Sequence, residues 1–286
     1  MASRPKHDRL AAAKRFYAAM AAAAAGGELR SELERAFEFI PREHFLGAGP
    51  WQALSVPTGL YLQTPTDDPI HVYQNTLFAL DRGKGINNGE PCLHGQLLGA
   101  LHPNRGDAVL HIGCGTGYYS AVLAQLVGPA GSVIAYEIDP ELARRAAAAL
   151  KPWDNVEVRA NSGTAAVLPP CDAVYVNAGA TRPLAAWLDA LREGGRLVFP
   201  LSSSGQNRSG VSLAVIRIGQ AFAARAIGYS AFIDCGGATD ADEGARVAAA
   251  FHSGALWRTR SLIRDDKPDD NAVLIGTGWW LSSASP

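Results

Sequence analysis

The chain has 286 residues, of which 48% are apolar and 19% are charged, and its formal net charge is -1. This composition is typical of a globular protein with a sizeable core, and the balanced charge excludes an electrostatic case for nucleic acid or an anionic membrane surface. No stretch is apolar and long enough to predict a membrane span, and no signal peptide is recognisable.

The four cysteines, Cys92, Cys114, Cys171 and Cys235, lie far apart and form no C-x-x-C pair. This spacing argues against a disulfide framework and against a zinc site. We therefore expect free thiols, no bound metal and a cytoplasmic location.

The N-terminal part begins with helical sequence. An alanine-rich run over residues 8–25 predicts a helix, with a low-complexity linker as the alternative. A second helix is predicted over residues 31–40, with Ser31 as its N-cap. Residues 47–91 are irregular, with one predicted strand over residues 72–80. Their aromatic side chains favour an ordered lid or binding region over a disordered linker.

Beyond these segments, helices and strands alternate. A short helix is expected at residues 93–101, strands at 108–112, 132–137, 156–159, 173–176 and 196–200, and helices at 118–127, 140–150 and 183–191. Repeated β-α-β units predict a mostly parallel sheet covered on both faces. A hairpin over residues 211–227, a helix over 242–252 and a strand over 272–281 follow.

A glycine-rich loop follows the first of the alternating strands. The run from His111 to Tyr118 reads His-Ile-Gly-Cys-Gly-Thr-Gly-Tyr, between a strand and a helix. Ligands of open α/β sheets bind at the carboxyl ends of strands, where the start of the next helix offers free N–H groups. Dinucleotide-binding loops use G-x-G-x-x-G, whereas these glycines fall at strict intervals of two.

The second strand ends in two acids with different expected roles. Glu137 lies 20 residues beyond Gly117, where its carboxylate can accept hydrogen bonds from two ribose hydroxyls; a surface carboxylate is the alternative. Asp139 precedes Pro140 and is predicted to be a helix N-cap. Ile138 is expected either to pack on an adenine face or to occupy a core position.

The loop resembles the S-adenosylmethionine loop of class I methyltransferases, and most closely that of the protein-L-isoaspartate O-methyltransferase family. Residues 40–46, 172–180 and 191–201 are similar to other segments of that family. The resemblance covers residues 30 to 230. It implies an α/β fold with a Rossmann-like seven-stranded sheet, mostly parallel with an antiparallel terminal strand, plus N-terminal helices and a C-terminal extension.

The resemblance also implies a domain division and a cofactor. N-terminal helices and a substrate or lid region would span residues 1–106, the cofactor-binding core 107–234, and the extension 235–286. S-adenosyl-L-methionine is the expected cofactor. Its predicted ligands are Gly113, Cys114, Gly115, Thr116, Gly117, Tyr118, Glu137, Ile138, Ser162, Gly163 and Asn177; Ser162 or Asn161 replaces the acid that holds the adenine amino group in the family.

The sequence departs from the family at the turn before the cofactor strand. The family has a Thr-Ile-Ser-x-Pro-like turn whose hydroxyl faces the substrate carboxylate, whereas this chain has Asn87 and Asn88. Their amides are predicted to orient the acceptor, and a simple turn is the equally supported alternative. His94 is predicted to bind a substrate or cofactor carboxylate, with a capping or packing role as the alternative.

The implied activity is methyl transfer to a carboxylate, in an isoaspartyl or aspartyl side chain of a protein or peptide. A carboxylate is ionised at neutral pH, so the reaction needs alignment rather than a strong base. Two alternatives stay open: a small molecule or a dedicated natural-product peptide as acceptor, and a cofactor-binding adaptor without turnover. The sequence makes no prediction of oligomeric state.

Overall fold

The large sheet and the N-terminal helices belong to different units of the computed structural model, which describes residues 6–164, 167–205 and 208–286. The first unit comprises residues 1–106, 114–132 and 139–158, and the second comprises 107–113, 133–138 and 159–286. This division cuts across the domain boundaries expected from the sequence, which stay a prediction.

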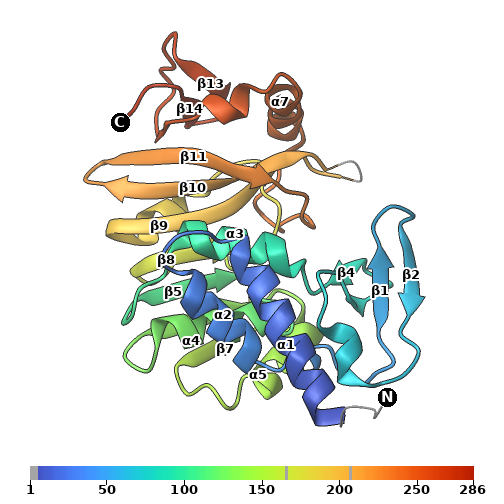
Figure 1. The fold of residues 1–286 in the computed structure, drawn as a ribbon. Coiled ribbons are helices and arrows are strands. Elements are labelled where there is room, and N and C mark those ends of the chain that lie inside the picture. The colour runs from blue at the N-terminus through green and yellow to red at the C-terminus, as the bar shows by residue number, and fades with distance from the viewer. Residues whose placement is uncertain (1–5, 165–166, 206–207) are drawn as a thin grey trace. The chain divides into compact units, whose positions relative to one another are not determined.

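The large mixed sheet has the strand order β13-β14-β12-β11-β10-β9-β8-β5-β6-β7 (Figure 1), and all of its strands except most of β7 belong to the second unit. Strand β5 pairs in parallel with β8, and β8 with β9, whereas β9, β10 and β11 pair antiparallel. The strands are β5 (Ala108–Ile112), β6 (Ser132–Tyr136), β7 (Val156–Arg159), β8 (Cys171–Val176), β9 (Leu191–Ser202), β10 (Gly210–Ile218), β11 (Ala221–Tyr229), β12 (Ser261–Ile263), β13 (Ala272–Ile275) and β14 (Trp280–Ser282).

The predicted alternation of strands and helices is confirmed, but the sheet has ten strands among the described residues where the resemblance implied seven. The difference lies at the antiparallel edge, where β12, β14 and β13 extend the sheet. The prediction of a single strand over residues 272–281 was wrong. Gly276 N–H donates to the Trp279 carbonyl at 2.9 Å, and this turn splits the segment into β13 and β14.

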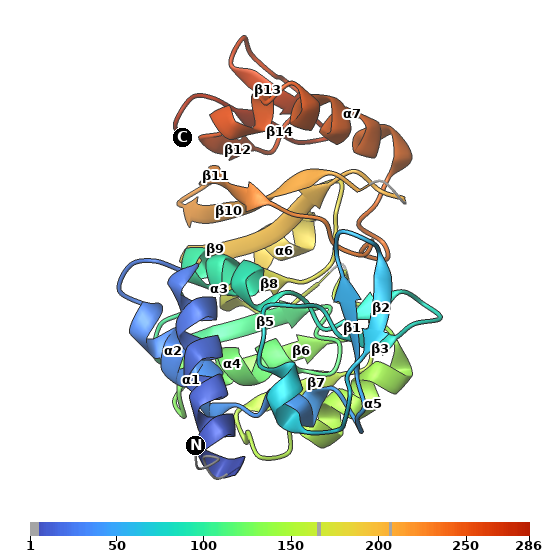
Figure 2. The same cartoon turned by 45° about the vertical axis from the view of Figure 1, so that its right-hand side comes forward.

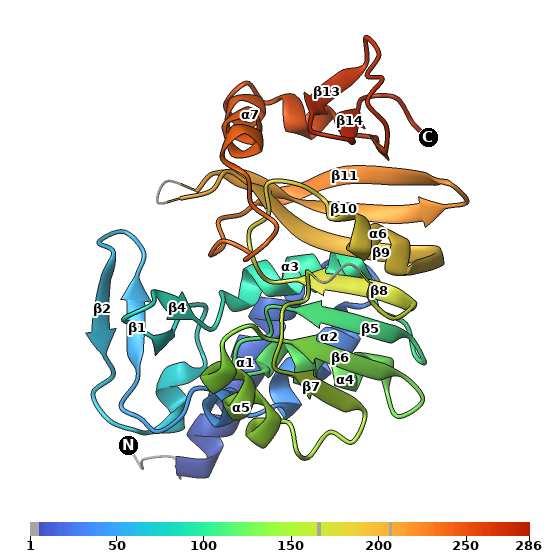
Figure 3. The same ribbon diagram turned by 180° about the vertical axis from the view of Figure 1, so that it is seen from behind.

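Two helices of the second unit follow the sequence prediction closely. Helix α6 (Ala185–Ala190) places Trp187 in the core, and α7 (Ala241–His252) begins at its N-cap Asp240. Figure 3 shows α7 beside β13 and β14. The buried Glu243 joins these elements, because its Oε1 accepts hydrogen bonds from the Thr277 N–H at 3.0 Å and from Trp279 Nε1 at 3.2 Å.

The first unit contains α1 (Lys6–Ala23), α2 (Arg30–Phe39), η1 (Arg42–Phe45), α3 (Pro91–Leu101), α4 (Tyr118–Val127) and α5 (Pro140–Ala149). Its helices meet around buried aromatic rings: Tyr17 contacts Phe37 edge-on, and Phe45 contacts Tyr118. The helical reading of the alanine-rich run is confirmed. Ser31 as N-cap was wrong, because α2 begins one residue earlier and its entry is fixed by the buried Leu29 rather than by a side-chain cap.

Residues 47–91 are ordered, as the aromatic residues suggested. They form β1 (Gln52–Ser55), β2 (Leu60–Gln63), η2 (Pro69–Val72), β3 (Ala79–Asp81) and β4 (Ile86–Asn87) (Figure 2). The predicted strand over residues 72–80 is confirmed only at its end, in β3, and was wrong for the residues before it. The Val72, Gln74 and Thr76 carbonyls bind the buried Arg42 side chain at 2.7 Å each, in place of a neighbouring strand.

Candidate functional site

Three strand ends of the second unit carry predicted ligand residues on one edge of the sheet. Gly113 follows β5, Glu137 follows β6 and Asn177 follows β8. The Gly113 N–H donates to the Tyr136 carbonyl at 2.9 Å, and the Asn177 N–H donates to the Ile112 carbonyl at 2.8 Å. Backbone pairing therefore brings these residues together at the carboxyl ends of the parallel strands, where ligands of such sheets bind.

Glu137 is only 7% exposed, although it lies at a strand end. Burial, and after it the charge of Glu137, raises the pKa of the Cys235 thiol to about 12, so Cys235 is protonated at neutral pH. Ile138 is 63% exposed, and the Gly236 backbone lies close to its side chain. A buried carboxylate beside an open apolar side chain is the arrangement that a ribose and an adenine ring require.

The predicted separation of the two acids is confirmed for Asp139. Its Oδ1 accepts hydrogen bonds from the N–H groups of Glu141 and Leu142, which makes it the N-cap of α5. Bonds from Lys84 and from these N–H groups hold the pKa of the Asp139 carboxyl below its ordinary value. Asp139 is thus committed to local structure.

The predicted Ser162 is part of a hydroxyl pair. Its Oγ lies 2.6 Å from Thr164 Oγ1, and Thr164 Oγ1 also donates to the Gly236 carbonyl at 3.3 Å. The carbonyl of the predicted Gly163 accepts from Trp187 Nε1 at 2.9 Å. Sequence reasoning missed Thr164 and Gly236, because Gly236 returns to this place from 72 residues along the chain.

His111 and Asn177 form a polar pair inside the second unit. His111 Nε2 lies 2.8 Å from the side-chain amide of Asn177. Burial lowers the pKa of His111 to about 3, so the imidazole is neutral at physiological pH. One polar atom of the Asn177 amide has no partner among the described residues. The imidazole fixes one end of the amide, and the ligand role of Asn177 stays a prediction.

The rest of the glycine-rich loop lies in the first unit, and it requires glycine at its last position. Gly117 has a φ of 95°, and a Cβ there would lie 2.6 Å from Leu150 Cδ1. Helix α4 begins at the next residue, Tyr118, whose hydroxyl lies 2.9 Å from that of Tyr17 in the core. Tyr118 is thus placed to offer a ligand its backbone N–H, not its ring.

The remaining predicted residues of this loop, Cys114, Gly115 and Thr116, precede the helix within the first unit. Cys114 and Thr116 are 6% and 3% exposed, respectively. Gly115 lies near the Leu80 side chain, which approaches to 3.6 Å of where a Cβ would be. Cys114 and Thr116 are therefore buried while Gly115 is half-buried, and the ligand role of the loop stays a prediction.

The two asparagines of the acceptor turn, defined here as residues 87–89, differ in their bonds. Asn87 Oδ1 accepts from the Gly89 N–H at 3.0 Å, which is the geometry of a simple turn. Asn88 forms a reciprocal pair with Phe78, donating its N–H at 3.0 Å and accepting at Oδ1 at 2.8 Å. Asn88 is 8% exposed, and its Nδ2 has no partner among the described residues. Asn88 therefore retains a buried donor.

The His94 ring packs between the acceptor turn and Tyr119. It is 2% exposed and stacks on Tyr119, with ring centroids 3.6 Å apart and planes 10° apart. Gly89 has a φ of 76°, and a Cβ there would lie 2.1 Å from His94 Nε2. These contacts favour the packing alternative for the His94 ring, and its predicted binding of a carboxylate stays a prediction.

Arg42 is a positioning residue whose role the sequence did not reveal. It is fully buried, and its guanidinium lies over the Tyr17 and Phe78 rings at 5.5 and 5.1 Å. Together with its bonds to three loop carbonyls, these contacts fix the segment that leads into Phe78, and hence the partner of Asn88. The available signal was its place in residues 40–46, one of the segments that are similar to the family.

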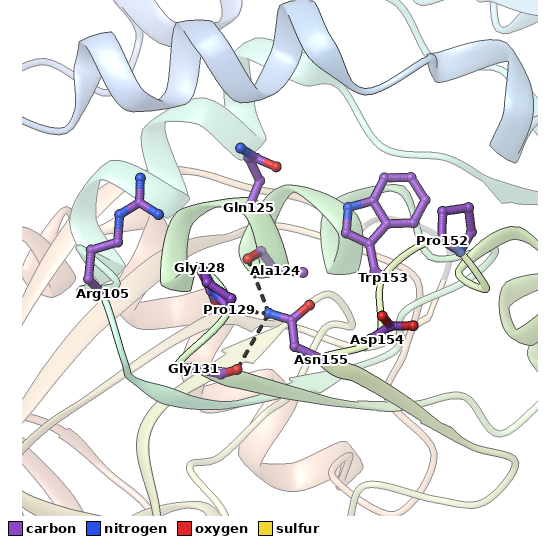
Figure 4. Close-up of a pocket in the computed structure, with 10 residues that line it drawn as sticks. All are labelled: Arg105, Ala124, Gln125, Gly128, Pro129, Gly131, Pro152, Trp153, Asp154 and Asn155. Carbon is purple, nitrogen blue, oxygen red and sulfur yellow. Dashed lines mark hydrogen bonds between the residues drawn. The ribbon is translucent and has the colours of Figure 1, made fainter.

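A hollow of about 540 Å³ lies elsewhere in the first unit, at the C-terminal end of α4 (Figure 4). Asn155 lines it and donates from Nδ2 to the carbonyls of Ala124, Gly128 and Gly131 at 3.3, 2.9 and 3.4 Å. The Ala124 and Gly128 carbonyls also accept the N–H groups of Gly128 and Gly131, so Asn155 reinforces the turn that ends the helix. None of the lining residues is a predicted site residue, and the contacts assign Asn155 a structural role.

Comparison with known proteins agrees with the resemblance. The family model described as "Protein-L-isoaspartate(D-aspartate) O-methyltransferase (PCMT)" matches residues 25–214. A protein-L-isoaspartate O-methyltransferase of Ignicoccus hospitalis is 35% identical over 176 residues, which are 60% of this chain and 74% of that protein. Protein-L-isoaspartate O-methyltransferase 2 of Archaeoglobus fulgidus is 34% identical over 178 residues, 60% of this chain and 80% of that protein.

Solved structures show the same fold. A protein-L-isoaspartate O-methyltransferase structure aligns with a TM-score of 0.60 at 20% identity, covering 82% of this chain and 66% of the other. A putative protein-L-isoaspartate O-methyltransferase of Plasmodium falciparum, in complex with S-adenosyl-L-homocysteine, aligns with a TM-score of 0.56 at 15% identity, covering 82% and 99%. The predicted Rossmann-like methyltransferase fold class is thereby confirmed.

Proposed function

Because the chain belongs to the protein-L-isoaspartate(D-aspartate) O-methyltransferase family, we propose that it transfers a methyl group from S-adenosyl-L-methionine to a carboxylate in an isoaspartyl or aspartyl side chain of a protein or peptide. The family match carries the proposal, since it includes both the glycine-rich loop and the acceptor turn. The family, the enzyme class and the methyl donor that the sequence predicted are confirmed by these matches.

The second unit fits the donor molecule. Glu137 is a buried acceptor for ribose hydroxyls, and Ile138 offers an exposed apolar surface to the adenine ring. Close approach of Gly163 to Ile112 leaves no room for a side chain, since a Cβ would lie 2.7 Å away. S-adenosyl-L-methionine supplies a methyl group on a sulfonium. We assign Glu137, Ile138, Ser162, Gly163 and Asn177 to holding it in place.

The acceptor turn supplies the orienting donor. A carboxylate attacks the methyl group in line and is ionised at neutral pH, so the protein must align it and exclude water. Asn88 Nδ2 is a buried donor without a partner among the described residues, and it stands where the family has a hydroxyl. A hydrogen bond from Nδ2 to one carboxylate oxygen leaves the other oxygen free to attack. We assign this role to Asn88, with Asn87 as the turn residue.

The test is transfer of label from S-adenosyl-L-methionine with a labelled methyl group to an isoaspartyl peptide. We expect a base-labile methyl ester, and no label on the same peptide with asparagine in place of isoaspartate. Binding of S-adenosyl-L-homocysteine without transfer to any isoaspartyl or aspartyl peptide would contradict the proposed acceptor. If no peptide is methylated but label is found on a small molecule of a cell extract, the alternative of a small-molecule acceptor is supported.

Cellular location is part of this proposal. The structure has no helix, within the residues described, that is long and apolar enough to cross a membrane. All four cysteines are free thiols. Free thiols are usual in a reducing compartment, which supports the proposed cytoplasmic location.

A further inference from the structure

The hairpin of β1 and β2 ends in a strand with a free edge. Strand β1 pairs with β2 on one side, and on the other side the Leu54 N–H donates to the Leu77 carbonyl at 2.8 Å. Strand β2 has no second neighbour among the described residues. Figures 1 and 3 show β2 as the outer strand of this hairpin.

The backbone pattern shows which residues of β2 face outward. The Thr64 N–H donates to the Trp51 carbonyl at 2.8 Å. The backbone N–H and C=O of Thr64, and those of Leu62 two residues before it, therefore point toward β1. Hydrogen-bonding groups alternate along an antiparallel strand. Tyr61 and Gln63 therefore turn both N–H and C=O to the open edge. Such a row is complementary to the backbone of another extended polypeptide.

The side chains of β2 do not block this edge. Natural edge strands are usually protected by lysine, proline or an inward-pointing charge. Strand β2 has none of these and reads Leu-Tyr-Leu-Gln. Leu60 and Leu62 are 62% and 60% exposed on one face, and on the other face the Arg82 guanidinium lies 5.5 Å from the Tyr61 ring centre. An added strand would meet apolar side chains on one face and a cation on the other.

The free edge is continuous with the acceptor turn. Strand β1 is bridged to Phe78 through Ala53, and Phe78 forms the reciprocal pair with Asn88. Successive backbone pairings thus lead from β2 to the turn that carries the predicted donor. The hairpin and the two-stranded sheet of the acceptor turn are therefore separate sheets that the Ala53–Phe78 bridge links.

From these observations we propose that the outer edge of β2 binds an extended segment of the acceptor polypeptide by strand addition, at a distance from the methylated residue. The proposal rests on the proposed function, because it assumes a polypeptide acceptor. The segment that fits has apolar residues at alternate positions on one face and acidic residues on the other, opposite Arg82. Main-chain bonds to Tyr61 and Gln63 hold it, and the leucines select its apolar face.

The geometry sets the length of the acceptor. An added strand lies four strand spacings from the Asn88 turn, about 19 Å at about 4.8 Å per spacing. An extended chain covers that distance with about six residues at about 3.3 Å each. Six residues only bridge the two places and leave none to pair with β2, so a six-residue acceptor cannot occupy both. An 18-residue acceptor with the recognition segment at one end can.

The experiment measures binding by fluorescence anisotropy, without methyl donor, of a six-residue isoaspartyl peptide and of two 18-residue peptides. The longer peptides carry an alternating valine and glutamate segment before or after the isoaspartyl residue. We expect one longer peptide to bind at least about tenfold more tightly than the short one. Gln63→Pro removes an outward N–H and should abolish this advantage, whereas Gln63→Val retains the N–H and should keep it.

A second measurement does not depend on folding of a variant. N-methylation of alternate residues in the recognition segment should remove the tenfold advantage on the wild-type protein when the blocked N–H groups face β2, and preserve it in the other register. Equal affinity of long and short peptides, an advantage that survives Gln63→Pro, or an advantage that survives N-methylation in both registers would overturn the strand-addition proposal. Retained binding of the longer peptide with no methyl transfer would refute the proposed function alone.

Discussion

The two units hold their predicted ligand residues by different means. In the second unit, Gly113, Glu137 and Asn177 stand at the ends of neighbouring strands, and ladder hydrogen bonds place them. In the first unit, the acceptor turn depends on side chains that bind backbone: Asn88 on Phe78, and Arg42 on the loop before it. The proposed donor side is thus held by the sheet, whereas the proposed acceptor side depends on a few individual side chains.

Replacing Arg42 is expected to have the largest effect on this contrast. Arg42→Met leaves three loop carbonyls without their donor, and we expect the free energy of unfolding to fall by about 3–4 kcal/mol. Urea unfolding measures the loss, and calorimetry with S-adenosyl-L-homocysteine measures the donor side.

Arg42→Lys is the matched control for this substitution. A lysine retains the charge but loses the fork that reaches three acceptors, so part of the stability should remain. Methyl transfer should fall for both variants while affinity for S-adenosyl-L-homocysteine stays within about threefold. A parallel loss of cofactor affinity would contradict the separation of the two sides.

What could be predicted from the sequence follows the same division. The helix that begins at Tyr118 and the N-cap Asp139 were correct, because glycine spacing and capping signals act over a few residues. The strand pattern and the 20-residue offset from Gly117 placed Glu137 at a strand end, and it directly follows β6. Each of these features depends on residues that lie close together in the sequence. Such short-range patterns recur at each β-α unit of the parallel sheet.

The acceptor side could not be predicted in the same way. The bonds from Arg42 join residues 30 to 34 positions apart, and they convert an expected strand over residues 72–80 into a loop. The free edge of β2 and the hydroxyl pair with Thr164 likewise depend on which segments meet in space. No local pattern distinguished Asn87 from Asn88; only the partners of their amides do.

The carboxylate of Glu137 offers the next largest test, on the donor side. Glu137→Gln keeps the shape but removes the charge that accepts from two ribose hydroxyls. We expect the Kd for S-adenosyl-L-homocysteine to rise about 10- to 100-fold, the loss of about 1.5–3 kcal/mol from a charge-assisted hydrogen bond. Glu141→Gln is the control, because this carboxylate is exposed and bound to Arg144. Equal effects of the two substitutions would refute the assignment of Glu137.

Asn88→Asp tests the acceptor side with little change of shape. The new side chain keeps an oxygen for the Phe78 N–H but replaces the unpartnered Nδ2 with a second oxygen, which repels a carboxylate acceptor. We expect kcat/KM for an isoaspartyl peptide to fall about 10- to 30-fold, with cofactor affinity unchanged. Asn87→Asp keeps the bond from Gly89 and should have a much smaller effect. The reverse ranking would transfer the orienting role to Asn87.

The smallest expected effect is the pH dependence that His111 gives to the donor side. Burial lowers the pKa of His111 to about 3 in the folded chain, against about 6.5 when unfolded. Between these values the unfolded chain binds more protons, so the stabilising contribution is complete above about pH 6.5 and is lost as the pH falls toward 3. Between pH 7.5 and 5.5 the free energy of unfolding should drop by about 1.4 kcal/mol more than in His111→Gln, which does not titrate. Urea unfolding at the two pH values measures this difference. Equal drops would mean that His111 is protonated in the folded protein at pH 5.5. An imidazolium cannot accept a hydrogen bond from Asn177. The amide would then have to present Oδ1 to the ring and Nδ2 to the ligand.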